Sequence, residues 1–209
     1  MKEFSLARQN KAFPRDIKAF LVIGVQVAPF LGLGILTSVL GYQLVSLIPN
    51  NAGIFFQVAF LALLFGMVIL DTEPGWNIVL FLTFGLVSGM MIHWSGAEIS
   101  QLRIWILFLI LVLISITGGF YLKRETGPEA GILFSGTFLY MIGWILFLLT
   151  TLPRIMRTIW IVLGLVLFTL VAMAVINQGK TQNAEDMTIP LSIQLFVVLF
   201  NLFWLSTSL

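Results

Sequence analysis

The sequence contains no cysteine and a single histidine, and these absences exclude several kinds of chemistry. Without cysteine there is no disulfide, no thiol catalysis, no iron–sulfur cluster and no thiolate metal site. Because His93 is the only histidine, a zinc or haem site built from several histidines is also excluded. The sequence therefore predicts neither a metal site nor a cofactor.

Charged residues are scarce as well. Lys, Arg, Asp and Glu make up 10% of the chain, against roughly 25% in a soluble domain. The net charge of +2 is too small to indicate a nucleic-acid partner. No Asp, Glu, Lys or Arg lies between Ala19 and Leu70, or inside any later apolar segment. Proton relays and ion pathways usually place such groups at membrane depth. Their absence argues against a proton-coupled pump, whereas a pore lined by carbonyls or amides stays open.

Apolar residues, by contrast, are abundant. They form 59% of the chain, and its mean hydropathy of +1.06 is typical of a protein whose outer surface faces lipid. A helix needs roughly 20 apolar residues to cross the hydrocarbon of a bilayer. Segments of about that length predict helices over 19–48, 54–70, 76–94, 104–122, 130–152, 158–177 and 189–209. The longest connecting loop is expected at 178–188, and a tilt or kink is expected at Pro29 and Gly32.

These segments predict an all-α, polytopic membrane helix bundle with seven transmembrane helices. A polar N-terminal tail of residues 1–18 precedes one transmembrane domain of residues 19–209. The first apolar run, of about thirty residues, is far longer than the core of a signal peptide, about 7–15 residues. We therefore expect it to be a retained helix. An alternative with six spans, in which the first segment lies partly in the interface, stays open.

Lys and Arg are distributed unevenly between the two predicted sides. The N-terminal tail and the loops on its side carry eight of them, and the other side carries Arg103, Arg154 and Arg157. Because the cytoplasmic side is normally richer in Lys and Arg, we expect a cytoplasmic N-terminus. We expect the membrane to be a bacterial inner membrane, a thylakoid-type membrane or an organelle membrane. Membrane lipids are expected partners.

Three amides stand in almost wholly apolar surroundings: Gln57, Gln194 and Asn201. They either line a polar pathway or make hydrogen bonds between helices. The last segment, which carries Gln194 and Asn201, is expected to be central. Both of its amides should then face other helices, because an amide in contact with lipid is costly.

Other residues also allow two interpretations. His93 could ligate a pigment or a metal, or it could belong to an aromatic belt at the membrane interface. Arg154 and Arg157 share a helical face. They could bind an anionic lipid or an acidic partner, or simply flank a helix. The spacings Gly85-x-x-x-Gly89 and Gly131-x-x-x-Ser135 favour close helix packing, and we expect it inside the bundle rather than in a dimer.

Five short stretches of the sequence form a further pattern: FFQVAF at 55–60, LTFGLVSGM at 82–90, NQGKTQN at 177–183, PLSIQ at 190–194 and LFNLF at 199–203. Together they resemble the Bax inhibitor-1 family of integral membrane proteins, which includes the bacterial YccA-like proteins. The resemblance implies a bundle in which six helices wrap the last one. Some members of this family are described as pH-sensitive calcium leak channels, gated by acidic residues in the second helix and the last two helices.

This chain departs from that pattern. Gln57 stands at the matching position of the second segment, and neither 172–175 nor 196–200 contains an acid. A carboxyl pair that titrates near neutral pH is therefore missing, as are the charged oxygens that calcium prefers. The sequence predicts a non-enzymatic protein that acts through protein–protein contacts, as an assembly, stability or accessory factor of a larger membrane complex. A small cation (calcium or proton) leak channel or transporter is the alternative. An intramembrane enzyme lacks a candidate set of catalytic residues.

Overall fold

The structure is a computed structural model, and it describes residues 24–25, 27–48, 52–69, 74–94, 101–122, 128–149, 153–181 and 184–209. Within these ranges all regular secondary structure is helical, as the sequence predicts. The polar N-terminal tail of residues 1–18 lies outside the described residues.

The helices follow the predicted segments closely. The first helix spans Val27–Leu47 and ends in a 3₁₀ turn, η1 (Val45–Leu47). It continues through Pro29 and Gly32 without a break in the helix. The remaining helices are α2 (Gly53–Ile69), α3 (Pro74–Trp94), α4 (Leu102–Tyr121), α5 (Pro128–Leu149), α6 (Arg154–Thr181) and α7 (Ala184–Thr207).

The predicted long loop at 178–188 is wrong. Helix α6 continues to Thr181 and α7 already begins at Ala184, so the connection between them is short. The reason is that polar residues mark the end of an apolar run rather than the end of a helix. The first turn of α7 contains Glu185 and Asp186, and acidic residues there favour a helix because they complement its macrodipole.

In the described part of the chain, three helices are long and apolar enough to cross a membrane: Val27–Leu47, Leu102–Tyr121 and Arg154–Gly179. Two shorter apolar helices span Asn77–His93 and Leu191–Thr207. The outward faces of the first helix, α4 and α6 expose many large apolar side chains, among them Leu36, Leu113 and Val166. An apolar surface of this extent marks contact with a membrane or with protein.

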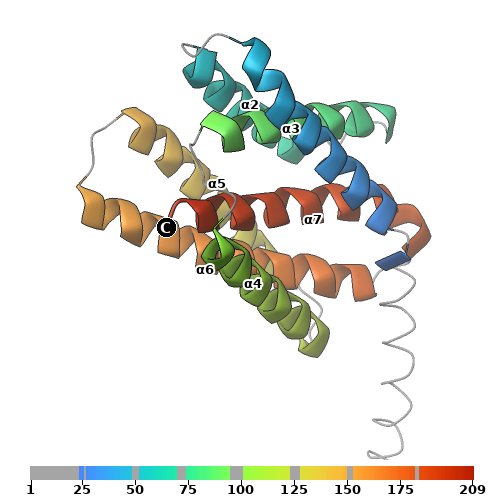
Figure 1. The fold of residues 1–209 in the computed structure, drawn as a ribbon. Coiled ribbons are helices and arrows are strands. Elements are labelled where there is room, and N and C mark those ends of the chain that lie inside the picture. The colour runs from blue at the N-terminus through green and yellow to red at the C-terminus, as the bar shows by residue number, and fades with distance from the viewer. Residues whose placement is uncertain are drawn as a thin grey trace, which may run out of the picture.

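Helix α7 lies inside the arrangement. Figure 1 shows it between one layer formed by the first helix, α2 and α3, and another formed by α4, α5 and α6. On the first side, Phe196 and Phe200 of α7 pack against Phe84 of α3 with ring centroids 6.1 and 5.9 Å apart. Phe60 of α2 stacks on Phe84 at 5.1 Å and meets Phe200 at 5.6 Å. These rings fill the centre of the main hydrophobic core.

Aromatic side chains also join α7 to the second layer. Trp204 of α7 stacks on Trp144 of α5 at 4.9 Å. Phe203 of α7 lies 5.0 Å from Trp105 of α4, centroid to centroid. Burial on several sides explains why α7 is apolar around most of its circumference rather than amphipathic.

The first helix and α3 approach each other through small residues. A Cβ added to Gly85 would overlap Oγ1 of Thr37, and one added to Gly89 would overlap the carbonyl oxygen of Ser38. Only glycine allows this approach of the two backbones. The prediction that Gly85-x-x-x-Gly89 packs inside the bundle is confirmed.

Candidate functional site

Asn201 is the buried amide of α7. Its side chain is 4% exposed, so the expectation that it faces other helices is confirmed. Its Nδ2 donates a hydrogen bond of 2.7 Å to the carbonyl oxygen of Val197, one turn earlier in the same helix. A short polar side chain in a helix often bonds in this way to its own backbone. The amide donor is thus satisfied within α7.

For Gln194 the same expectation is wrong, because this side chain is exposed. Gln194 lies seven residues before Asn201, so the two amides share one face of α7. Neither the hydrogen bonds nor the other polar contacts of the described chain include the amide of Gln194. The amide of Gln194 is therefore exposed, although most of α7 around it is buried.

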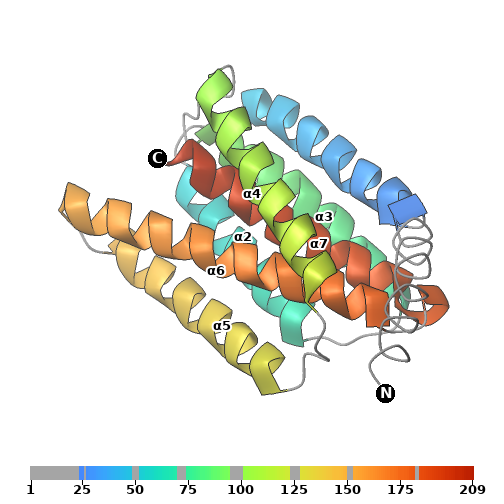
Figure 2. The same cartoon turned by 90° about the horizontal axis from the view of Figure 1, so that it is seen from below.

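Helix α5 packs on the bundle mainly at its end. Helices α5 and α6 meet at the end of α5 and separate toward its beginning (Figure 2). A Cβ added to Gly143, late in α5, would overlap Trp160 of α6. One added to Gly136, two turns earlier, would only touch Leu167 at 3.5 Å. Helix α5 contacts α7 at Trp204, through Trp144 near the end of α5.

Gln57 is partly buried and lies far from Gln194. It precedes Phe60 by less than one turn of α2, and the ring of Phe60 lies 5.9 Å from that of Trp204. Trp204 follows Gln194 by ten residues, about 15 Å along the helix axis. The three amides singled out from the sequence therefore do not form one polar site.

Helices α6 and α7 each bury a further polar side chain. Their antiparallel packing brings Gly179 against Leu191, and Gly164 against Leu205. Asn177 of α6 is 1% exposed and Ser192 of α7 is 0% exposed, and both take part in polar contacts. Sequence analysis did not single out either residue as a candidate site.

His93 lies at the end of α3 and is exposed. Its ring meets that of Tyr42 in a T-shaped contact, with centroids 4.8 Å apart. No group of three or more His, Asp or Glu residues that could hold a metal occurs in the described part of the chain. An exposed imidazole beside an aromatic ring at a helix end suits the aromatic belt of a membrane interface.

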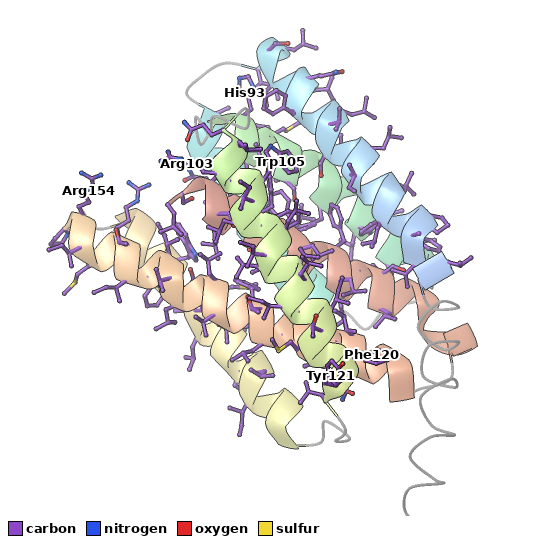
Figure 3. The ribbon with its side chains drawn as sticks, turned by 60° about the horizontal axis from the view of Figure 1, so that its bottom comes forward. His93, Arg103, Trp105, Phe120, Tyr121 and Arg154 are labelled. Carbon is purple, nitrogen blue, oxygen red and sulfur yellow. The ribbon has the colours of Figure 1, made fainter. Side chains whose placement is uncertain are left out.

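The arginines stand at the starts of helices. Arg154 and Arg157 lie in the first turn of α6, and Arg103 lies in the first turn of α4. All three are exposed, and Figure 3 shows Arg154 at the tip of α6 and Arg103 near the start of α4. A cation at a helix N-terminus opposes the macrodipole and costs about 0.3–1 kcal/mol. Helix stability therefore does not explain these positions, and contact with an anionic lipid or an acidic partner stays a prediction.

Aromatic stacking closes the bundle where α5 and α6 meet. The Tyr140 ring stacks on that of Trp160 at 4.9 Å, and its hydroxyl donates a hydrogen bond of 3.2 Å to the Trp160 carbonyl oxygen. Gly143 and Gly164 leave room for these rings, since a Cβ on either would overlap one of them. This contact joins the two helices.

Comparison with known proteins adds no relative. No protein-family model matches the sequence, and no curated protein matches it. The resemblance to the Bax inhibitor-1 family therefore stays a prediction.

Proposed function

We propose that this chain is a non-enzymatic integral membrane protein, with a Bax inhibitor-1-like bundle of seven spans and a cytoplasmic N-terminus. It acts through contacts with other membrane proteins, as an assembly, stability or accessory factor of a larger complex. Each part of this proposal is supported by a different feature of the chain.

The observation that carries the proposal is the composition of the core around α7. Packed rings such as Phe60, Phe84, Phe196 and Phe200 occupy its centre. The buried hydroxyls of Ser115, Thr169 and Ser206 donate hydrogen bonds to carbonyls of their own helices. Among the described residues, the buried side chains of this interior include no charged group. Contacts with other molecules are therefore made by side chains on the surface.

The surface suits a membrane partner. Helix α4 exposes Leu109, Leu113 and Ile114 along one face, and α6 exposes Val162, Val166 and Leu170. Arg103, Arg154 and Arg157 stand at one end of these faces. Their guanidinium groups can bind phosphates of anionic lipids, which would hold the apolar faces at a fixed depth. Lipids cover these faces where no protein partner does.

A small cation leak is the second candidate, and the exposure of Gln194 favours it. Gln194 lies in line with Asn201 on one face of the internal helix, so the two amides could begin a polar path. Asn201, however, is buried and bonded to its own helix. Amides also cannot titrate, so such a path would have no switch near neutral pH.

Purification from native membranes in mild detergent, followed by mass spectrometry, tests the proposal. We expect other membrane proteins to co-purify in stoichiometric amounts. Ile110→Trp on α4 and Val166→Trp on α6 place bulk on two outward faces. A partner that packs on one of these faces should be lost from that variant and retained by the other. A chain that purifies alone and conducts cations in liposomes would overturn the proposal in favour of the leak.

A further inference from the structure

Helix α5 packs on the rest of the bundle along only part of its length. Its first half diverges from α6 (Figure 2), and Ile132 and Ser135 on that half are exposed. The expectation that Gly131-x-x-x-Ser135 packs inside the bundle is therefore wrong at Ser135. A segment with few buried contacts can open at a low cost in free energy. The exposed side chains of this half thus contribute little to holding α5 in place.

The second half of α5 is held by a small group of aromatic rings. Tyr140 stacks on Trp160 of α6, and Trp144 stacks on Trp204 of α7, each pair with ring centroids 4.9 Å apart. Such pairs stabilise a contact beyond the area that they bury. We call these four rings the α5 latch, because they join this helix to both of its neighbours.

Two hydrogen-bond donors in the α5 latch have no partner. Nε1 of Trp160 and Nε1 of Trp204 are both buried and unbonded. A Cβ added to Gly143 of α5 would lie 3.4 Å from Cε2 of Trp160, the ring atom bonded to Nε1. By contrast, the indole of Trp144 hydrogen-bonds to the hydroxyl of Tyr140, one turn earlier in α5. A buried donor without a partner destabilises the arrangement that buries it. This penalty falls on the rings that α5 covers, and not on the rings that α5 carries.

Opening of α5 would give both donors a partner. Trp160 lies six residues after α6 begins at Arg154, and Trp204 lies three residues before α7 ends at Thr207. Both indoles are therefore near helix ends, where tryptophan N–H groups at a membrane surface meet water and polar headgroups. Opening thus exchanges the stacking of the α5 latch for two hydrogen bonds. Because these contributions are similar in size, the closed and open arrangements are close in free energy.

We propose that α5 is a movable element of this fold, which swings away from α6 and α7 and exposes the indoles of Trp160 and Trp204. The pivot is the end of α5, since only a short connection separates Leu149 from the start of α6 at Arg154. The first half of α5, which already diverges from α6, moves farthest. The inference goes beyond the proposed function, because it concerns a movement within the chain and holds with or without a partner protein.

Distances between spin labels measure this movement, and the absence of cysteine allows labels at chosen sites. Ile132→Cys on α5 and Val166→Cys on α6 lie at exposed positions, so nitroxide labels there do not disturb the core. Pulsed electron–electron double resonance in lipid nanodiscs should give two populations of distances for this pair. Val79→Cys on α3 with Val166→Cys is the matched control across α7 and should give one. A single population for the α5 pair, as narrow as that of the control, would overturn the proposal.

Two further variants separate the unbonded donor from the stacking. Trp144→Phe and Trp204→Phe each shrink one ring of the same stacked pair. Only Trp204→Phe also removes a donor that is unbonded while α5 is closed, since Trp144 and Tyr140 belong to the same helix and stay bonded in both arrangements. We expect the ratio of open to closed molecules to be at least about fivefold higher in Trp144→Phe than in Trp204→Phe. The control pair should keep its distance in both variants. Equal ratios, or a higher ratio in Trp204→Phe, would show that the unbonded donors do not favour opening.

Discussion

The contact between the first helix and α3 makes a prediction in which two similar substitutions have opposite effects. Gly→Ala in the interior of a helix normally stabilises it by roughly 0.5–1 kcal/mol. Gly32 lies on the first helix with nothing within 4 Å of an added Cβ. Gly32→Ala should therefore be neutral or stabilising by that amount. At Gly89 the added Cβ overlaps the carbonyl oxygen of Ser38, which is backbone and cannot rotate away.

Gly89→Ala must instead push the two helices apart. Overpacking of this kind typically costs about 1–3 kcal/mol, which outweighs the gain in helix propensity. For a chain of this size, each kcal/mol lowers the melting temperature by about 2–4 °C. We expect Gly89→Ala to melt several degrees below the original protein in mild detergent, and Gly32→Ala to melt at or above it.

Intrinsic tryptophan fluorescence and size-exclusion chromatography after heating would measure both variants side by side. Gly136→Ala, where the added Cβ meets Leu167 at 3.5 Å, is a second control inside the bundle and should be tolerated. If Gly89→Ala is as stable as Gly32→Ala, the first helix does not approach α3 as closely at Gly89 as the structure shows. The glycine spacing would then need another explanation.

The other predictions concern topology, ion flux and lipid binding. Compartment-sensitive reporters at the two ends should report opposite sides of the membrane, with the N-terminus cytoplasmic; two ends on one side would exclude seven spans. Calcium flux through the reconstituted protein should stay near background and unchanged between about pH 6 and 8, the range in which a histidine or a raised acid titrates. A flux rising several-fold across that range would refute this, and His93→Gln would be the first variant to study. Replacing Arg154 and Arg157 together by Gln should lower the anionic lipid retained through purification, measured by lipid mass spectrometry, while Thr158→Ala beside them should leave it unchanged.

Sequence analysis located the helices well because the length of an apolar run is a local property. The ends of α2, α3 and α4 differ by at most two residues from the predicted segments. The junction of α6 and α7 was missed because a helix can extend beyond the hydrocarbon, where polar residues are allowed. At this junction hydropathy locates the end of each apolar run, whereas the helices themselves continue past it.

The candidate site was less predictable, since it depends on how helices diverge. Gln194 and Asn201 have similar apolar neighbours in the sequence and share one face of α7. The structure nevertheless buries Asn201 and leaves Gln194 exposed. Composition around a polar residue thus indicates that it lies at depth, but its neighbours come from tertiary packing.

The central position of α7 has a consequence for the biosynthesis of the protein. This helix follows all the others in the chain, so the ribosome delivers it after they have entered the membrane. Until then Phe60 and Phe84 lack the rings of Phe196 and Phe200 against which they pack. Before α7 is present, the earlier helices cannot pack fully, and their inner faces contact lipid or an insertion factor. The order of synthesis therefore makes closure of the bundle a late event, and a ribosome that stalls before α7 leaves a product that membrane quality control can recognise.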